Sequence, residues 1–474
     1  MTQDNISEKL RALALAAIMV LSVVGMSVAF AGSAVGQSDE ITITADDTAA
    51  DAVEKIETAP EGTTVIIENG VDITLGEPVD IDNSSVVIQG EDGSLDNGPV
   101  IQMDSLGTGD EGFSIRAENV EISDIRIVDD TSAGVAWNIR TKANGTIVDN
   151  VAIERDASNT GLSGLANPSI NFLDVSDATV TDSSLKNGAI NLRLSEGGEA
   201  TIKGNEFTMP SGFPNAFFVT GESFDPLSEN VDLTIENNGE IAIADRTTND
   251  YIRGFTTISG ALNAPQTDDP VGQNGTVSVA PGTYKESVTL DVTNVTLKGP
   301  NAGLAGTSSD RGSEALINGT ITTSAEGVVV DGLTVSPDEK FTDKAAAGVF
   351  VNSNDTLVKN NVIEGISGNG SVSVHGIQVF KQKSPRIENI TVSNNLIQDL
   401  NNTESNGNYN GASGVKIQNQ LTNIDILDNT IEDVHSAGWT YGIVSTPSSD
   451  SRTQPEDVLV SGNTIDDVGN GDEY

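Results

Sequence analysis

Four stretches near the end of the chain share one pattern: LVKNNVIEGI (357–366), TVSNNLIQDL (391–400), DILDNTIEDV (425–434) and LVSGNTIDDV (459–468). In each, an asparagine stands between apolar residues, and one or two acidic or amide residues follow. The asparagines recur every 34 residues, at Asn361, Asn395, Asn429 and Asn463. Apolar residues that alternate with a period of two indicate strands rather than helices.

Strands that begin near a glycine lie between these stretches: AGVFVNS (347–353), HGIQVFK (375–381), SGVKIQN (413–419) and YGIVSTP (441–447). A fixed period made of strands and turns is typical of a solenoid. Equivalent residues of successive coils then lie about 4.8 Å apart. Amides at that spacing can donate and accept along the stack, so we predict a structural asparagine ladder. The alternative is that asparagine only favours turns.

Earlier stretches repeat the pattern less regularly. Leu333 occupies the ladder position in GVVVDGLTVS, and Ile125, Val151, Ser183 and Asn205 occupy it in the first half of the chain. The last four lie 26, 32 and 22 residues apart, which fits coils whose loops differ in length.

The chain starts the same pattern twice. A short amphipathic helix followed by a strand is predicted in TAADAVEKIETAPEGTTVII (48–67), and again with a longer connector from residue 256. An open coil end needs a cap. We therefore expect a first β-helix domain over 37–248 and a second over 249–474, each with an N-terminal capping helix. No cap is visible at the C-terminal end.

TVSVAPGTYKESVTLDVTNVTLKGPNAG (276–303), followed by EALINGTITTSAEGVVVDGLTV (314–335), resembles the opening of right-handed parallel β-helix proteins of the pectin-lyase-like class. The later coils are similar to their parallel β-helix repeats, over roughly residues 41 to 474. The resemblance implies an all-β solenoid. It does not imply one function, because this fold hosts lyases, hydrolases, esterases, epimerases, adhesins and accessory proteins.

The net charge is −46, from 24 basic and 70 acidic residues among 474. Nucleic acids and anionic membranes need a positive surface, so the charge argues against both as partners. Molar salt would screen the repulsion between these carboxylates, so the acidity indicates adaptation to brine.

The N-terminus has Lys9 and Arg11, an apolar run over 12–31 and small residues after it. These features predict a secretory signal peptide over 1–36, with an uncleaved anchor as the alternative. This segment resembles the signal peptides of surface-layer glycoproteins of halophilic archaea. We therefore expect a secreted or cell-surface protein. In that setting the Asn-x-Ser/Thr sequons are candidates for N-glycosylation: Asn83, Asn144, Asn274, Asn294, Asn318, Asn354, Asn369, Asn389 and Asn401.

No metal site or cofactor is predicted. The chain lacks cysteine, and its two histidines, His375 and His435, are sixty residues apart. Acidic pairs such as Asp129–Asp130 and Asp466–Asp467 could hold calcium, but no calcium-binding motif is present. Copper handling would need histidine or methionine clusters, which two His and five Met do not supply.

Side chains that point out of the coils are the candidates for a site. If Val349, Ile377, Val415 and Ile443 point inward, two outward columns follow: Phe350, Gln378, Lys416 and Val444, then Asn352, Phe380, Gln418 and Thr446. Neither column holds a carboxylate, although glycoside hydrolysis usually needs two. The ligand-binding candidates here are Phe350, Gln378, Phe380, Gln418 and Tyr441, with Trp439 and Tyr409 in adjacent loops.

In the first half, Asn171 and Asn191 are expected in one outward column and Asn138 and Arg193 in the next. These three asparagines are further ligand-binding candidates. Arg193 could meet an anionic sugar or pair with a carboxylate. Arg193, Lys416 and His375 are weak catalytic candidates. For His375, a hydrogen-bonding role at the start of a strand is the better explanation.

We therefore expect an exported surface protein that binds glycans or other surface polymers, or that acts as a rigid spacer. The alternative is a polysaccharide lyase or glycoside hydrolase whose catalytic groups come from loops. The lack of outward carboxylates favours the first hypothesis. Two carboxylates in one groove would favour the second.

Overall fold

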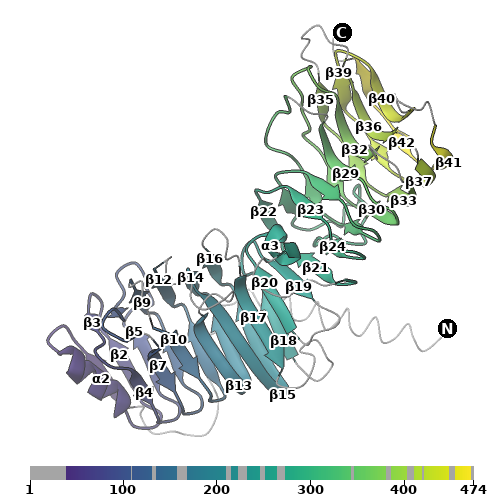
Figure 1. The fold of residues 1–474 in the computed structure, drawn as a ribbon. Coiled ribbons are helices and arrows are strands. Elements are labelled where there is room, and N and C mark those ends of the chain that lie inside the picture. Colours follow the sequence, from purple (N-terminus) through teal and green to yellow (C-terminus); the bar gives the residue numbers. More distant parts are fainter. Residues whose placement is uncertain are drawn as a thin grey trace. The chain divides into compact units, whose positions relative to one another are not determined.

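The computed structural model describes residues 39–107, 109–130, 135–156, 168–209, 215–221, 232–245, 251–263, 273–342, 346–380, 386–402, 410–418, 421–447 and 454–470. The predicted signal peptide and Tyr409 lie outside these residues. The described chain is a parallel β-helix, which confirms the predicted fold class: short strands follow one another around each coil and pair with those of the next (Figure 1). No helix among the described residues is long and apolar enough to cross a bilayer.

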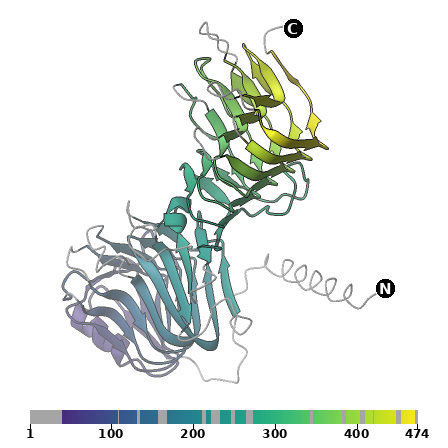
Figure 2. The same cartoon turned by 45° about the vertical axis from the view of Figure 1, so that its right-hand side comes forward.

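Residues 40–255 form what we call the first barrel, whose strands stack on three faces (Figure 2). We call one of them the groove face; it contains β4 (Val79–Ile81), β7 (Glu111–Ile115), β10 (Trp137–Thr141), the first halves of β13 (Pro168–Thr181) and β15 (Ala189–Lys203), β17 (Asn215–Gly221) and β20 (Tyr251–Phe255). The second contains β1 (Glu40–Ile43), β2 (Thr64–Ile67), β5 (Val87–Gly90), β8 (Glu121–Ser123), β11 (Thr146–Asp149), the second halves of β13 and β15, and β18 (Asp232–Glu236). The third contains β3 (Asp72–Thr74), β6 (Val100–Gln102), β9 (Arg126–Asp129), β12 (Ala152–Arg155), β14 (Ser184–Lys186) and β16 (Glu206–Thr208).

Residues 276–470 form the second barrel, which also has three main faces. One contains β21 (Thr276–Val279), β24 (Thr296–Lys298), β27 (Val329–Asp331), β30 (Thr356–Lys359), β33 (Ile387–Ser393), β37 (Leu421–Leu427) and β41 (Glu456–Ser461). The next contains β22 (Gly282–Tyr284), β25 (Ala315–Ile317), β28 (Thr334–Val335), β31 (Val362–Ile363), β34 (Leu396–Ile397), β38 (Thr430–Ile431) and β42 (Thr464–Ile465). The third contains β23 (Val288–Leu290), β26 (Ile321–Thr323), β29 (Ala346–Val351), β32 (Val374–Phe380), β36 (Ala412–Gln418) and β40 (Thr440–Thr446). A small sheet adds β35 (Leu400–Asn402), β39 (Val434–Ser436) and β43 (Val468–Asn470).

Each barrel has its own apolar core. One cluster of buried residues runs from Ile43 to Ile252 and the other from Ala242 to Val434. Between them, β19 (Ala242–Asp245) pairs antiparallel with both β20 and β21, and β20 pairs antiparallel with β17. The other strand pairs of the described residues are parallel. The division into two domains at residue 248 stays a prediction.

Both helices lie where the chain starts its pattern. Helix α2 (Ala49–Glu57) begins with a capping box between Thr48 and Asp51 and buries Ala52, Val53 and Ile56. Helix α3 (Ile258–Asn263) follows β20. The carboxylate of Glu286 accepts hydrogen bonds from the first two backbone N–H groups of α3.

A ladder of asparagines runs through the second barrel. The side-chain amide of Asn361 donates to Asn395 Oδ1 at 3.1 Å, Asn395 to Asn429 and Asn429 to Asn463, both at 2.9 Å. Each Nδ2 also donates to a backbone carbonyl, and the first three side chains are buried. The residue before each ladder asparagine turns the chain with a positive φ, between 55° and 71°, at Asn360, Asn394, Asp428 and Gly462. Asparagine, aspartate and glycine are the residues that tolerate this conformation.

The first barrel has a shorter, mixed version of this ladder. Val151 N–H donates to Ser183 Oγ, and Ser183 N–H donates to Asn205 Oδ1, both at 3.0 Å. The Asn205 amide donates to Asn238 Oδ1 at 2.9 Å. The spacing of the sequence does not identify Asn238, because the coil before it has another length.

Candidate functional site

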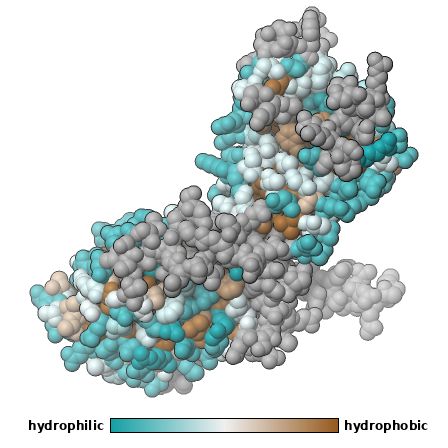
Figure 3. All heavy atoms as spheres, viewed as in Figure 1, coloured by the Kyte–Doolittle hydropathy of each residue, from teal (hydrophilic) through white to brown (hydrophobic). Residues whose placement is uncertain are grey.

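The groove face carries one column of outward side chains across seven strands. The register of the strands aligns Asp80, Ser114, Arg140, Asn171, Asn191, Phe218 and Arg253. The core residues next to them, such as Phe113, Ile139 and Ile170, are fully buried. Figure 3 shows apolar patches on the first barrel within a mainly hydrophilic surface. The column therefore joins polar and aromatic groups from coils far apart in sequence.

A pocket of about 340 Å³ opens at the end of this column. Its walls include the rings of Trp137 and Phe218, the amides of Asn171 and Asn191, and Arg253. Asn191 Nδ2 donates to Asn171 Oδ1 at 2.7 Å, which fixes both amides. The Arg253 guanidinium lies 4.8 Å from the centre of the Phe218 ring, and its side chain is only 8% exposed.

A larger hollow of about 800 Å³ lies beside the first strands of the column. Five carboxylates line it: Glu57, Glu77, Asp80, Asp110 and Glu111. Two of them form ion pairs with arginines, Asp80 with Arg116 at 2.7 Å and Glu111 with Arg140. The Arg140 guanidinium also lies 4.5 Å from the centre of the Trp137 ring, so it stands between the hollow and the pocket.

A buried ion pair lies behind the pocket. Arg155 Nε and Asp129 Oδ2 are 3.3 Å apart, and neither side chain is exposed. Arg155 also donates to the backbone carbonyls of Val135, at 2.5 Å, and Pro168, at 3.4 Å. Burial raises the pKa of Asp129 and lowers the pKa of Arg155, and the charge of each partner opposes both shifts. Pro168 and Trp137, which follows Val135 by two residues, line the pocket. The hydrogen bonds of Arg155 therefore hold the two chain segments that form the pocket wall.

Two predictions for the first barrel have different outcomes. Arg193 pairs with Asp174, with 2.5 Å between Nη2 and Oδ2, as expected for a base on an acidic surface. The placement of Asn138 in an accessible column with Arg193 was wrong. Asn138 has no exposed surface, and its amide lies 3.4 Å from the Met103 sulfur, so it cannot meet a ligand outside the coil.

In the second barrel the predicted inward and outward positions hold. Val349, Ile377 and Val415 are fully buried, and strand pairing aligns Phe350, Gln378, Lys416 and Val444. Gln378 is only 4% exposed, whereas Phe350, Phe380 and Gln418 are half-buried. As sugar contacts, these four stay predictions.

Five side chains of β32, β36 and β40 and the turn before β40 form what we call the aromatic cluster: His375, Ser413, Lys416, Trp439 and Tyr441. His375 stacks on Trp439 with 6.0 Å between ring centres and 18° between planes. Trp439 and Tyr441 have ring centres 5.5 Å apart. Lys416 Nζ lies 5.7 Å from the centre of the Trp439 ring.

His375 is the buried anchor of this cluster. Its Nδ1 lies 2.9 Å from Ser413 Oγ and its Nε2 lies 3.3 Å from Lys416 Nζ. An ammonium can only donate, so Nε2 accepts and Nδ1–H donates to Ser413. Burial lowers the pKa of His375 well below its usual range, and the charge of Lys416 lowers it further. Burial also lowers the pKa of Lys416.

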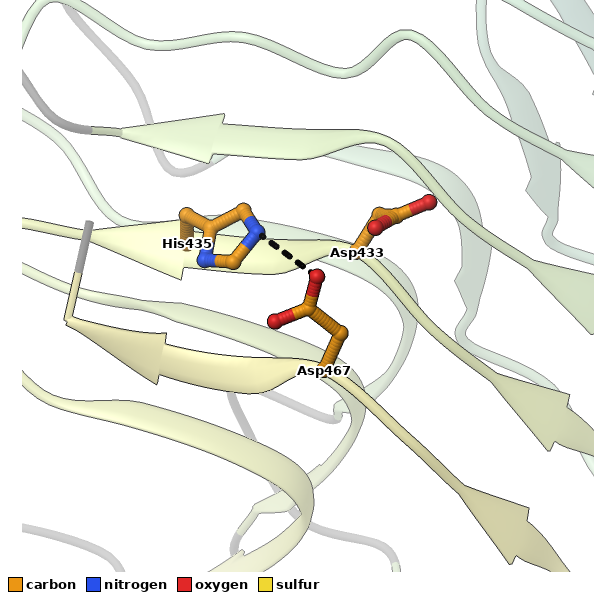
Figure 4. Close-up of side chains that lie close together, drawn as sticks. All are labelled: Asp433, His435 and Asp467. Carbon is orange, nitrogen blue, oxygen red and sulfur yellow. Dashed lines mark ion pairs between the residues drawn. The ribbon is translucent and has the colours of Figure 1, made fainter. Parts of the chain in front are cut away.

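Three metal-ligating side chains come together that the sequence did not link. Asp433, His435 and Asp467 offer ligand atoms within 4.8 Å of one another. Figure 4 shows the Asp467 carboxylate reaching from the next coil toward His435, 3.8 Å from its Nε2. Both carboxylates are exposed, and an ion pair accounts for the arrangement on so acidic a surface. We assign no metal to it.

The predicted glycosylation sequons fall into two groups. Asn274, Asn294, Asn389 and Asn401 are exposed. The remaining five, at Asn83, Asn144, Asn318, Asn354 and Asn369, are half-buried. Modification of any of them stays a prediction.

No protein-family model matches the chain, and no curated protein matches its sequence. An alginate lyase from Paenibacillus sp. str. FPU-7 aligns at 11% identity over 90% of this chain and 99% of that one, with a TM-score of 0.22. A PL6 family polysaccharide lyase from Pseudopedobacter saltans aligns at 10% identity over 90% and 92%, with a TM-score of 0.25. Tailspike protein 3 of bacteriophage CBA120 aligns at 9% identity over 88% and 59%, also at 0.25. Scores this low leave the function of this chain undecided.

Proposed function

We propose that the chain binds a polysaccharide along the groove face of the first barrel. The pocket between Trp137 and Phe218 carries the proposal. Sugar rings present C–H faces that pack on aromatic rings, and hydroxyl groups that bond to amides such as those of Asn171 and Asn191. A concave site with apolar walls and a few fixed polar groups is typical of ligand binding.

The column of the groove face suits a linear polymer. It crosses the strands at right angles to their direction, so a chain lying along it would meet a new side chain about every 4.8 Å. Among the described residues, the pocket itself is lined by Arg253 and by no carboxylate, whereas five carboxylates line the neighbouring hollow. An acidic polysaccharide would therefore meet less repulsion at the pocket than at the hollow.

We further propose that the protein works outside the cell, in brine. The basic start, apolar run and small residues of segment 1–36 support export. The excess of acidic residues supports a medium in which salt screens their repulsion.

A second candidate function is cleavage of the same polymer. The hollow beside the pocket is favourable to it, because five carboxylates line one surface there. Glycoside hydrolysis needs two carboxyl groups, one to protonate the leaving oxygen and one to activate water or attack the sugar. In this hypothesis the pocket would hold the polymer and the hollow would hold the scissile bond.

Calorimetric titration in molar salt with acidic and neutral polysaccharides tests the proposal. We expect Trp137→Ala and Phe218→Ala to weaken binding about tenfold, equivalent to about 1.4 kcal/mol. Leu459→Ala, which removes an exposed apolar side chain from β41 of the second barrel, outside both candidate sites, is the matched control and should bind like the wild type. Wild-type affinity in both groove variants would contradict the proposal. New reducing or unsaturated ends that disappear in Glu77→Gln or Asp110→Asn would instead establish cleavage.

A further inference from the structure

The aromatic cluster presents an accessible surface on the second barrel. Tyr441 is 46% exposed, and Trp439 and Lys416 are half-buried beside it. His375 below them has no exposed surface. The cluster therefore offers a ligand two aromatic rings and one ammonium group, all held from beneath by a buried imidazole.

Lys416 differs from most basic residues of this chain. Of the ion pairs in the described residues, eleven join a lysine or arginine to a carboxylate, and none of them includes Lys416. The polar partner of Lys416 is the neutral His375. This contact uses one of the three N–H donors of the Lys416 ammonium group. Two donors and an uncompensated charge remain directed away from the histidine.

The arrangement also explains why a histidine is buried here. Ser413 and Lys416 satisfy both ring nitrogens of His375, and Trp439 covers one face of its ring. These contacts fix the positions of Lys416 and of the Trp439 ring before any ligand binds. Binding therefore costs these two side chains little further conformational entropy.

We propose that the aromatic cluster is a second saccharide-binding site, which takes a sugar residue that carries a carboxylate or sulfate group. The sugar ring stacks on Tyr441 and Trp439, and its anionic group binds Lys416. The site does not depend on the groove of the first barrel. Occupation of both sites would make the chain bivalent, which raises its overall affinity for a long polymer.

The chain contains only two tryptophans, Trp137 in the first barrel and Trp439 in the cluster. In the full-length Trp137→Phe variant, tryptophan emission therefore reports the aromatic cluster alone. A short uronic-acid oligosaccharide should change this emission in a saturable way. The neutral, carboxyl-reduced oligosaccharide of the same length should give a response at least about tenfold weaker.

Substitutions in this background separate a specific site from a general charge effect. Lys416→Gln and Tyr441→Ala should each weaken the response about tenfold, and Lys416→Arg should retain most of it. Lys298→Gln removes the same charge from an exposed position on β24 and should leave the response unchanged. No saturable change, or an equal change in Lys416→Gln, would overturn the proposal. The groove proposal would survive either result, because Trp137 and Phe218 are tested separately.

Discussion

The two barrels use the same coil differently. In the second barrel the coils that carry the ladder repeat every 34 residues, so four asparagines stack in one file and the outward columns are regular. In the first barrel the coils differ in length, the ladder mixes Val151, Ser183 and Asn205, and the outer face is hollowed. The regular coils stack identical side chains in one file, whereas the hollow and the pocket lie on the barrel whose coils differ in length.

Basic residues pair with carboxylates in both barrels, but Lys416 does not. On the first barrel Arg116, Arg140 and Arg193 each pair with a carboxylate across neighbouring coils. On the second barrel Lys416 rests on a neutral histidine and an indole ring. Four comparisons test how the two barrels differ, taken in order of decreasing effect.

The largest effect is expected at the buried ion pair of the first barrel. Arg155→Leu leaves Asp129 buried without its partner, which should cost about 3–5 kcal/mol of unfolding free energy. Urea unfolding, followed by Trp137 emission in a Trp439→Phe background, measures this loss. The double variant Arg155→Leu with Asp129→Leu should recover most of it. A loss below about 1 kcal/mol would show that the pair does not hold the pocket wall.

A smaller effect is expected at the ladder of the second barrel. Asn395→Leu removes the acceptor of the Asn361 amide and the donor to the Val358 carbonyl, and it leaves buried polar groups without partners. We expect a loss of about 2–3 kcal/mol. Ser183→Ala in the first barrel removes the acceptor of the buried Val151 N–H and the donor to the part-buried Thr181 carbonyl, and should cost about 1 kcal/mol. Equal losses in the two variants would mean that the regular ladder is no more important than the mixed one.

The third effect depends on pH. His375 stays neutral in the fold, but the unfolded chain protonates it below a pKa of about 6.5, so unfolding takes up a proton there. Stability should fall as pH falls below about 6.5, by at most about 1.4 kcal/mol per pH unit. Besides His375, the titratable side chains of the aromatic cluster are Lys416 from β36 and Tyr441 from β40.

His375→Gln provides the control for this pH effect. Unfolding of the second barrel, followed by Trp439 emission in a Trp137→Phe background, should lose this slope in His375→Gln. Carboxylates titrate in both proteins, so the difference between them isolates the histidine. The same pH dependence in both would contradict a neutral, buried His375.

The smallest effect is expected at the exposed ion pair of the first barrel. Arg193→Gln breaks the contact with Asp174, but both side chains are about 40% exposed, at 43% and 41%. Exposed pairs contribute roughly 0–1 kcal/mol, and salt screens them further. Urea unfolding should therefore place this variant within about 0.5 kcal/mol of the wild type. A loss comparable to that of Arg155→Leu would reverse the contrast between buried and exposed pairs.

The sequence predicts the fold well where its period is constant. The alternation of Val349 and Phe350, and the spacing of Asn361 and Asn395, need only the geometry of a strand and a turn. The first barrel is harder, because a change in coil length moves every later residue and a slip of one residue exchanges the faces. Asn138 lies two residues before the outward Arg140, so alternation alone places it outward, and its burial beside Met103 depends on a contact with another coil.

Sequence periodicity does not identify several residues on which the two candidate sites depend. Arg253 reaches the groove face from an antiparallel strand, β20, which no parallel repeat anticipates. Trp439 comes from the turn before β40, and its stacking on His375 joins residues 64 positions apart. The buried pair of Asp129 and Arg155 likewise joins neighbouring coils, and only the pairing of β9 with β12 brings the two together.

Titration of the Trp439→Phe variant with an acidic polysaccharide tests the binding site of the first barrel most directly, because Trp137 is then the single tryptophan in the chain. We predict a saturable change in its emission, which needs about tenfold more polymer in Phe218→Ala and is unchanged in Lys416→Gln. Polymer that binds this variant tightly without any change in Trp137 emission would show that the groove face is not where the polysaccharide lies.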